Sequence, residues 1–221
     1  ALPIYGEDES SLSSTPKISS SATKTSDVGN YVISGSNATS NHYSISYSTG
    51  VLSITKAPLT AKVENTSKEY GSSNPSFCME FVGLKNGEKT PVWSSSPSYT
   101  TSATIKSSVG EYEISAKATP KNYELSEISS GILKITKAPL TLQANDLSKT
   151  YYSENPELTY TCNGLKYWDD ISVLTVGPIL STNAKKESNA GIYEITIKGA
   201  SAKNYVITYK DGHMNDKKRP L

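Results

Sequence analysis

The chain of 221 residues carries 22 basic and 21 acidic side chains, a net charge of +1, without a basic stripe or an acidic tail. This balance argues against nucleic acid and anionic membranes as partners. Tyrosine, serine and threonine are abundant and phenylalanine is rare, a mixture that favours half-buried β-strands over helical bundles.

One short motif recurs along the chain and sets its organisation. The sequence Ile-Thr-Lys-Ala-Pro-Leu-Thr occupies residues 54–60 and again residues 135–141, and residues 218–221 echo its end. The constant period of this motif is close to the size of a small domain and is longer than a solenoid repeat. The predicted modules are a partial first repeat at 1–57, a complete repeat at 58–138 and a third repeat with a divergent last strand at 139–221.

Residues 1–57 are typical of the second half of a module. Pro16, Gly29 and Tyr31 return at the same period in both later copies. The two strands that open the other modules are missing here, so we expect this repeat to be incompletely packed. No membrane-spanning segment or signal-like run is seen, and we expect a trimmed or mature fragment.

Each full module opens with a predicted half-buried strand, in which Leu59, Ala61 and Val63 alternate with polar neighbours. A loop follows that carries Tyr70-Gly71 in the second repeat and Tyr151-Tyr152 in the third. Because glycine tolerates a positive φ and tyrosine does not readily, this tight turn is less secure in the third repeat.

The later strands follow in the same order in both full modules. The second strand places Phe77, Met79 and Phe81 on one face, and the clearest alternation spans residues 112–116. An Asn-Tyr pair opens the fifth strand, whose extra residue in the middle copy predicts a β-bulge. The sixth strand enters the next copy through Lys-Ala-Pro alone, so we expect modules that stack lengthwise without a flexible spacer.

Two positions test the predicted core. Trp93 stands where Leu174 stands in the third copy, so we expect it to pack in the core. Asp216 stands in the place of Ile54 and Ile135. Because burying a charge is costly, we expect a frayed or re-registered last strand in the third repeat.

Several of these motifs together resemble a known family. They are the Tyr-Gly-x after the first strand, Asn-Pro, the Gly-Leu-x-Asn-Gly turn, the Gly-x-Tyr-x-Ile strand, Asn-Tyr and the Gly-x-Leu-x-Ile-Thr-Lys-Ala ending. The combination looks like the MBG repeat, Tyr-Gly-x type, of large bacterial surface and secreted proteins, and it covers the whole chain. The resemblance implies an extracellular, β-rich, adhesin-like repeat and offers no catalytic residue to carry over.

The predicted fold is all-β, with tandem small immunoglobulin-like β-sandwich modules in an extended array. The alternative is a β-grasp-like module with one short helix. His42 and His213 have no partner motif, and the sequence holds no nucleophile, phosphate-binding or metal-binding signature. Cys78 and Cys162 occupy non-equivalent positions and predict no repeated disulfide. We therefore expect no enzyme, no cofactor and no metal site.

One turn differs from its counterparts and is the best candidate for a contact site. Trp168 replaces Gly87 of the second repeat and is flanked by Tyr167, Asp169 and Asp170. Aromatic faces with nearby carboxylates suit sugar stacking or a divalent cation, and a contact between modules is an equally reasonable interpretation.

These observations favour one function over an alternative. We expect a non-enzymatic extracellular repeat segment of a bacterial cell-surface protein, acting as a stalk or adhesion array with neighbouring repeats as partners. The alternative is a carbohydrate-binding module that uses the turn at Trp168 to contact a host glycan or an extracellular protein. The same exposed aromatic residues do not recur in each copy, which favours the stalk.

Overall fold

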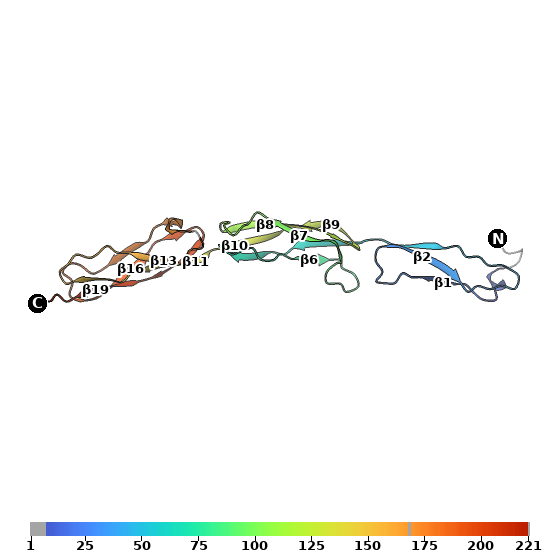
Figure 1. Cartoon of the computed structure of the whole chain (residues 1–221), viewed down its shortest axis with the longest axis horizontal. Coiled ribbons are helices and arrows are strands. Elements are labelled where there is room, and N and C mark those ends of the chain that lie inside the picture. Colours follow the sequence, from blue (N-terminus) through green and yellow to red (C-terminus); the bar gives the residue numbers. More distant parts are fainter. Residues whose placement is uncertain (1–7, 168, 221) are drawn as a thin grey trace. The chain divides into compact units, whose positions relative to one another are not determined.

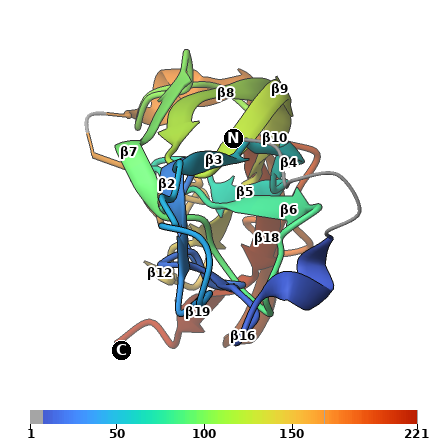
Figure 2. The same ribbon diagram turned by 90° about the vertical axis from the view of Figure 1, so that its right-hand side faces the viewer.

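The computed structural model describes residues 8–167 and 169–220 of the chain. Within these residues the regular elements are strands, apart from the short 3-10 turns η1 (Glu9–Ser11) and η2 (Ile171–Val173) (Figures 1 and 2). The predicted all-β class is therefore confirmed. In this described part, no helix combines the length and the apolar character that a membrane crossing needs.

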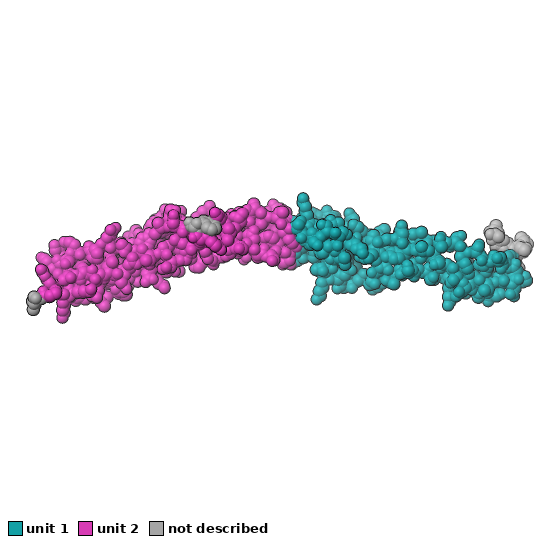
Figure 3. All heavy atoms as spheres, viewed as in Figure 1, with its two compact units in different colours: residues 1–62, 79–98, 116–129 teal, residues 63–78, 99–115, 130–221 magenta. Residues whose placement is uncertain are grey.

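The chain divides into two compact units, which Figure 3 colours separately. Unit 1 holds residues 1–62, 79–98 and 116–129, and unit 2 holds residues 63–78, 99–115 and 130–221. The join between the first and second repeats thus lies in unit 1, and the join between the second and third repeats lies in unit 2.

Unit 1 contains a three-stranded antiparallel sheet from the first repeat and a second sheet that opens the next repeat. The first sheet has the order β1 (Lys17–Ser20), β2 (Gly29–Ser36), β3 (Gly50–Ile54), and the second the order β6 (Met79–Val82), β4 (Ala57–Val63), β9 (Tyr123–Ser129). The parallel register of β4 and β9 pairs Leu59 with Leu125 but Ala61 with Ile128. The extra residue on β9 confirms the predicted bulge.

In unit 2 the third repeat is a sandwich of two sheets that pack against each other. One sheet has the order β13 (Tyr160–Asn163), β11 (Ala138–Ala144), β18 (Tyr205–Lys210), and the other the order β12 (Leu147–Thr150), β19 (Gly212–Lys217), β16 (Gly191–Lys198), β15 (Ile179–Thr182). The short strands β14 (Leu174–Val176) and β17 (Ser201–Ala202) pair beside them. Alternate residues such as Leu140, Ile195 and Met214 are buried, as a period of two requires.

Each of these two sheets contains a parallel pair, β11 with β18 and β12 with β19. Parallel neighbours need a long crossover connection, which the intervening strands of the module supply. The sandwich therefore differs from the purely antiparallel immunoglobulin arrangement. The second repeat shows the same pattern in the sheet β5 (Thr66–Glu69), β10 (Gly131–Thr136), β8 (Gly110–Pro120), β7 (Trp93–Thr101), where β5 and β10 are parallel.

The predicted first strand of the full modules is confirmed, because Leu59, Ala61 and Val63 are all buried in β4. Trp93 is half-buried, and its ring lies 5.7 Å from that of Phe81, between centroids. The two rings are tilted by 53° to each other, and aromatic pairs at such distances stabilise a fold beyond the area that they bury.

The last strand of the third repeat is not frayed, contrary to the expectation. β19 pairs with a strand on both sides, and Asp216 is only 2% exposed. Its Oδ2 lies 3.3 Å from Nζ of the buried Lys149, which also donates to the carbonyls of Ser153 and Lys185. A buried cation on the neighbouring strand supplies the counter-charge that makes a buried carboxylate tolerable.

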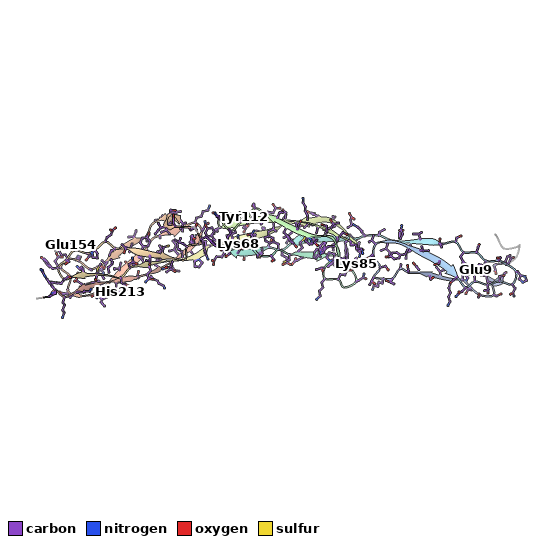
Figure 4. The ribbon with its side chains drawn as sticks, viewed as in Figure 1. Glu9, Lys68, Lys85, Tyr112, Glu154 and His213 are labelled. Atoms are coloured by element: carbon purple, nitrogen blue, oxygen red, sulfur yellow. The ribbon has the colours of Figure 1, made fainter. Side chains whose placement is uncertain are left out.

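In the second repeat, the position of Asp216 is taken by Ile135, and the buried lysine has no carboxylate beside it on that strand. Lys68 (Figure 4) is buried on β5, and its ammonium donates to the carbonyls of Ser72 and Thr104 at 2.9 and 2.7 Å. Ile135 is paired with Lys68 in the ladder, at the place that Asp216 takes in the third repeat. Burial lowers the pKa of Lys68. Backbone carbonyls can thus hold this lysine without a carboxylate.

We expect Lys149→Met to lower the free energy of unfolding of the third repeat by about 3–5 kcal/mol, because it leaves Asp216 as an unpaired buried charge. Asp216→Ile recreates the Lys68–Ile135 arrangement and should lower it clearly less. Urea unfolding followed by NMR signals of β19 measures both. Equal losses in the two variants would contradict the ion-pair explanation.

Candidate functional site

The turn that carries Asp169 lies against the end of the second repeat, within unit 2. Asp169 accepts a hydrogen bond at 3.0 Å from the hydroxyl of Tyr70, and the hydroxyl of Tyr205 donates to the same carboxylate oxygen. The two tyrosine rings meet edge to face, with centroids 5.5 Å apart at an angle of 78°. One carboxylate therefore joins a tyrosine of the second repeat to a tyrosine of the third.

Both phenols of this cluster are held in the protonated form. Burial raises the pKa of Tyr205 far above its ordinary value, and the hydrogen bond to Asp169 raises it further. Burial and then Asp169 likewise raise the pKa of Tyr70. A protonated phenol can donate to a carboxylate, so the two hydroxyls and the one anion are matched in role as well as in position.

The residues on both sides of Tyr70 complete this contact. Glu69 forms an ion pair with Lys166, with 2.7 Å between Oε1 and Nζ. Gly71 has a φ of +79°, and a Cβ there would lie 2.7 Å from Cγ of Lys166. Glycine is therefore required twice, for its backbone conformation and for the space that the lysine fills. The exposed ion pair itself contributes little stability.

A second contact fixes the other side of the same join. The side-chain oxygen of Asn204 accepts a hydrogen bond at 3.0 Å from the backbone N–H of Val109. Its side-chain nitrogen lies 3.5 Å from the Ser108 hydroxyl. The adjacent residues Asn204 and Tyr205 thus contact two separate loops of the preceding repeat. Two anchor points resist both bending and twisting of the join.

The join between the first and second repeats, in unit 1, is built on the same plan. Asn122 accepts at 3.1 Å from the backbone N–H of Val28, as Asn204 does from Val109. It also donates at 2.7 Å to Asp27, which forms a 2.6 Å ion pair with Lys121. The hydroxyl of Tyr123 donates to Glu88 at 2.7 Å.

The tyrosine–carboxylate pair of the third repeat is thus present in the second as well. Tyr123 corresponds to Tyr205, and Glu88 stands one repeat period before Asp169. In both pairs the backbone N–H of a lysine, Lys85 or Lys166, donates to the tyrosine hydroxyl, at 3.0 and 2.9 Å. The hydroxyl therefore accepts one bond while it donates another, which fixes its orientation.

Asp169 belongs to the predicted contact turn together with Tyr167, Trp168 and Asp170, and no hydrogen bond to Tyr70 or Tyr205 is found for the described residues Tyr167 and Asp170. Tyr167 is exposed and adopts a φ of +44°. Asp170 accepts from the N–H of Ser172 at the start of η2, and hydrogen bonding to the side chain and then to the backbone of Ser172 lowers the pKa of the carboxyl. Trp168 lies outside the described residues. The structure thus places Asp169 in a contact between modules, whereas a ligand role of the turn stays a prediction.

The sequence reasoning missed Tyr70, Tyr205 and Asn204 as members of the site. The sequence pattern alone indicates only that the recurring Asn-Tyr pair opens a strand. A signal was available, since an acidic residue recurs at 88 and 169 while the residues around it change. Only the fold shows that Asp169 lies beside Tyr70 of the preceding repeat.

The third repeat keeps the turn despite its tyrosine in the glycine position. Tyr152 adopts a φ of +69°, and the N–H of Ser153 donates to Thr150 at 2.9 Å, as Ser72 does to Glu69 in the second repeat. The doubt about this turn was therefore unfounded, although the left-handed conformation costs roughly 1–2 kcal/mol. Tyr151, which meets no later repeat among the described residues, is 40% exposed, against 9% for Tyr70.

We expect Asp169→Ala to destabilise the third repeat and to weaken its coupling to the second, because it leaves the buried phenols of Tyr205 and Tyr70 without their acceptor, a loss of about 1–3 kcal/mol for each. Tyr70→Phe keeps the ring contact and should cost less. Tyr151→Phe is the matched control and should change nothing. Thermal unfolding measured by calorimetry would show this as a lower midpoint, and an unchanged midpoint in Asp169→Ala would contradict it.

The raised pKa values predict an alkaline limit for this join. The stabilisation from the two protonated phenols is complete below the unfolded pKa of about 10 and is lost as the pH rises towards the higher folded values. Ultraviolet titration should show that Tyr70 and Tyr205 ionise after the exposed tyrosines, and Tyr70→Phe should remove one late step. Ionisation of all tyrosines together, at the ordinary phenol pKa, would refute this.

Comparison with known proteins agrees with this repeated plan. The profile of the MBG domain (YGX type) matches the chain three times in tandem, at residues 3–53, 59–134 and 140–215. A search of the curated proteins finds no match. The Tyr-Gly pair of the second repeat is Tyr70-Gly71, the pair that contacts the following module. Since the three matches cover most of its length, the chain belongs to the MBG domain (YGX type) family.

Proposed function

We propose that this chain is a non-enzymatic spacer in the extracellular part of a bacterial surface protein. The observation that supports this most is the repeated construction of the joins. At each join an Asn side chain accepts a hydrogen bond from a backbone N–H of the preceding repeat, and the next residue is a Tyr whose hydroxyl donates to an acidic side chain of its own repeat. Neither join consists of a flexible linker. A chain that only tethered two domains would not need such contacts.

The energies of these contacts suit a stiff connection. A hydrogen bond to a charged group contributes about 1.5–3 kcal/mol, and an edge-to-face aromatic pair contributes about 0.5–1.5 kcal/mol. Across the join, Tyr70 provides one such bond to Asp169 and one such pair with Tyr205, whereas the bond from Tyr205 to Asp169 lies within the third repeat. The sum is several times the thermal energy, so the join should rarely open. A spacer that projects a binding domain from a cell surface benefits from this property.

A second function is favoured by one observation: Tyr167 and Asp170, which belong to the same turn, are both exposed. This pair could contact a host glycan, with Trp168 as a further stacking surface. A glycan array that compares the chain with Trp168→Ala tests this function. We expect the variant to keep its fold, because Gly87 holds the corresponding turn position in the second repeat. Loss of fold in the variant would argue for a core role of Trp168.

The spacer proposal predicts the behaviour of the chain in small-angle scattering. A single compact globule of this length would have a radius of gyration of roughly 17 Å, and we expect a clearly larger value. Paired substitution of Tyr70 and Asp169 by alanine should broaden the distribution of distances, because the join loses its anchor. Tyr151→Ala is the control and should leave the distribution unchanged. A radius close to that of the compact globule, measured on the unmodified chain, would overturn the proposal.

A further inference from the structure

The opening stretch of the third repeat, formed by β11 and β12, runs beside its closing stretch, formed by β18 and β19, within unit 2. β11 pairs in parallel with β18, and β12 pairs in parallel with β19. The first pair of residues is Ala138 with Tyr205 and the last is Thr150 with Lys217, so the separation along the chain is the same in both ladders. The two stretches therefore form one long parallel pair.

The two stretches stay in contact where they pass together from one sheet of the sandwich to the other. At this crossing the backbone N–H of His213 donates to the side chain of Asp146 at 2.8 Å. Gly212 lies so close to the opening stretch that a Cβ on it would come within 2.5 Å of the carbonyl oxygen of Ala144. The parallel pair thus connects both sheets without a break.

Further bonds hold the pair of stretches at its ends and in its interior. The N–H of Ala138 donates to the carbonyl of Asn204 at 3.0 Å, and the N–H of Tyr151 donates to the carbonyl of Lys217 at 2.8 Å. Within the second ladder, Lys149 lies opposite Asp216, so the buried ion pair joins the two stretches. A slip by one residue would turn side chains to the wrong face and separate these charges in the interior, which is costly.

The second repeat has the same construction. Its opening strands β4 and β5 pair in parallel with its closing strands β9 and β10, the first ladder within unit 1 and the second within unit 2. At the crossing, the N–H of Ile132 donates to the side chain of Asn65 at 2.8 Å, and a Cβ on Gly131 would lie 2.7 Å from the carbonyl oxygen of Val63. The arrangement recurs although the residues of β10 and β19 differ at most positions.

The parallel direction decides how tension along the chain reaches these bonds. Tension pulls the opening stretch towards its N-terminus and the closing stretch towards its C-terminus. Because the stretches are parallel, these two termini lie at opposite ends of the pair, and the stretches are pulled past each other. The hydrogen bonds run between the strands, so the load falls on all of them together. In an antiparallel pair the pulled termini would lie at the same end, and the bonds would break one after another.

We propose that the second and third repeats are mechanical clamps, which bear tension applied along the polypeptide. Resistance to a pulling force depends on the barrier to unfolding and not on the equilibrium stability, and bonds that are loaded together raise that barrier. Such a repeat keeps its fold under a load that would unfold an equally stable domain whose terminal strands are antiparallel. The clamp is a property of a single repeat and does not rest on the spacer role.

The test pulls the third repeat in two directions within the whole chain. Handles are attached through cysteines at exposed positions, after Cys78 and Cys162 have been replaced by serine and alanine. Pro139→Cys with Lys217→Cys pulls the two stretches past each other, whereas Pro139→Cys with Val206→Cys pulls apart two residues that are paired in the ladder. In both cases only the third repeat lies between the handles. Single-molecule force measurement at one loading rate should give a severalfold higher unfolding force in the first direction.

A second pair of opposed positions controls for local effects of the first. Ser148→Cys with Asn215→Cys pulls apart the other ladder and should also give the low force. Equal thermal midpoints of the variants would assign the difference in force to the direction of the pull. Equal unfolding forces in the two directions, or a higher force when paired residues are pulled apart, would overturn the proposal. Flexible joins, seen in scattering, would overturn the spacer role and leave the clamp intact.

Discussion

The shared carboxylate of Asp169 is the interaction on which the organisation of unit 2 depends. It accepts hydrogen bonds from Tyr70 and Tyr205, which belong to different repeats, and holds their rings edge to face. Because both phenols are buried, neither can find water as a substitute acceptor without opening the join. A single anion thus couples the packing of one module to that of the next.

This arrangement gives a physical reason for the Tyr-Gly pair. Tyrosine supplies a ring that fills the join and a hydroxyl that reaches the acid, whereas phenylalanine would supply only the ring. Glycine supplies the positive φ that turns the chain away and leaves space for Lys166. Tyr152 shows that the turn itself survives without glycine. The glycine is therefore explained best by the contact with the following repeat.

The interior of each module depends on a less usual feature, a buried lysine that closes the loop after the first strands. The ammonium of Lys68 or Lys149 donates to two backbone carbonyls of the adjoining loops, which provides partners for the buried ammonium itself. Asp216 then adds a counter-charge in the third repeat, where Ile135 stands in the second. The same polar scaffold therefore accepts either an apolar or an acidic neighbour.

The sequence by itself determined the repeat period, the all-β class, the alternation of Leu59, Ala61 and Val63, and the bulge in β9, because these depend on local pattern and spacing. It did not determine whether Asp216 is buried in the last strand, since only the fold shows that Lys149 lies on the strand beside it and supplies the counter-charge. The tyrosine–carboxylate cluster also needed the tertiary structure, because its members lie far apart in the chain, with a separation of 99 between Tyr70 and Asp169. Periodicity reports which face of a strand is buried. It does not report which polar groups meet there, because that depends on how the repeats are joined.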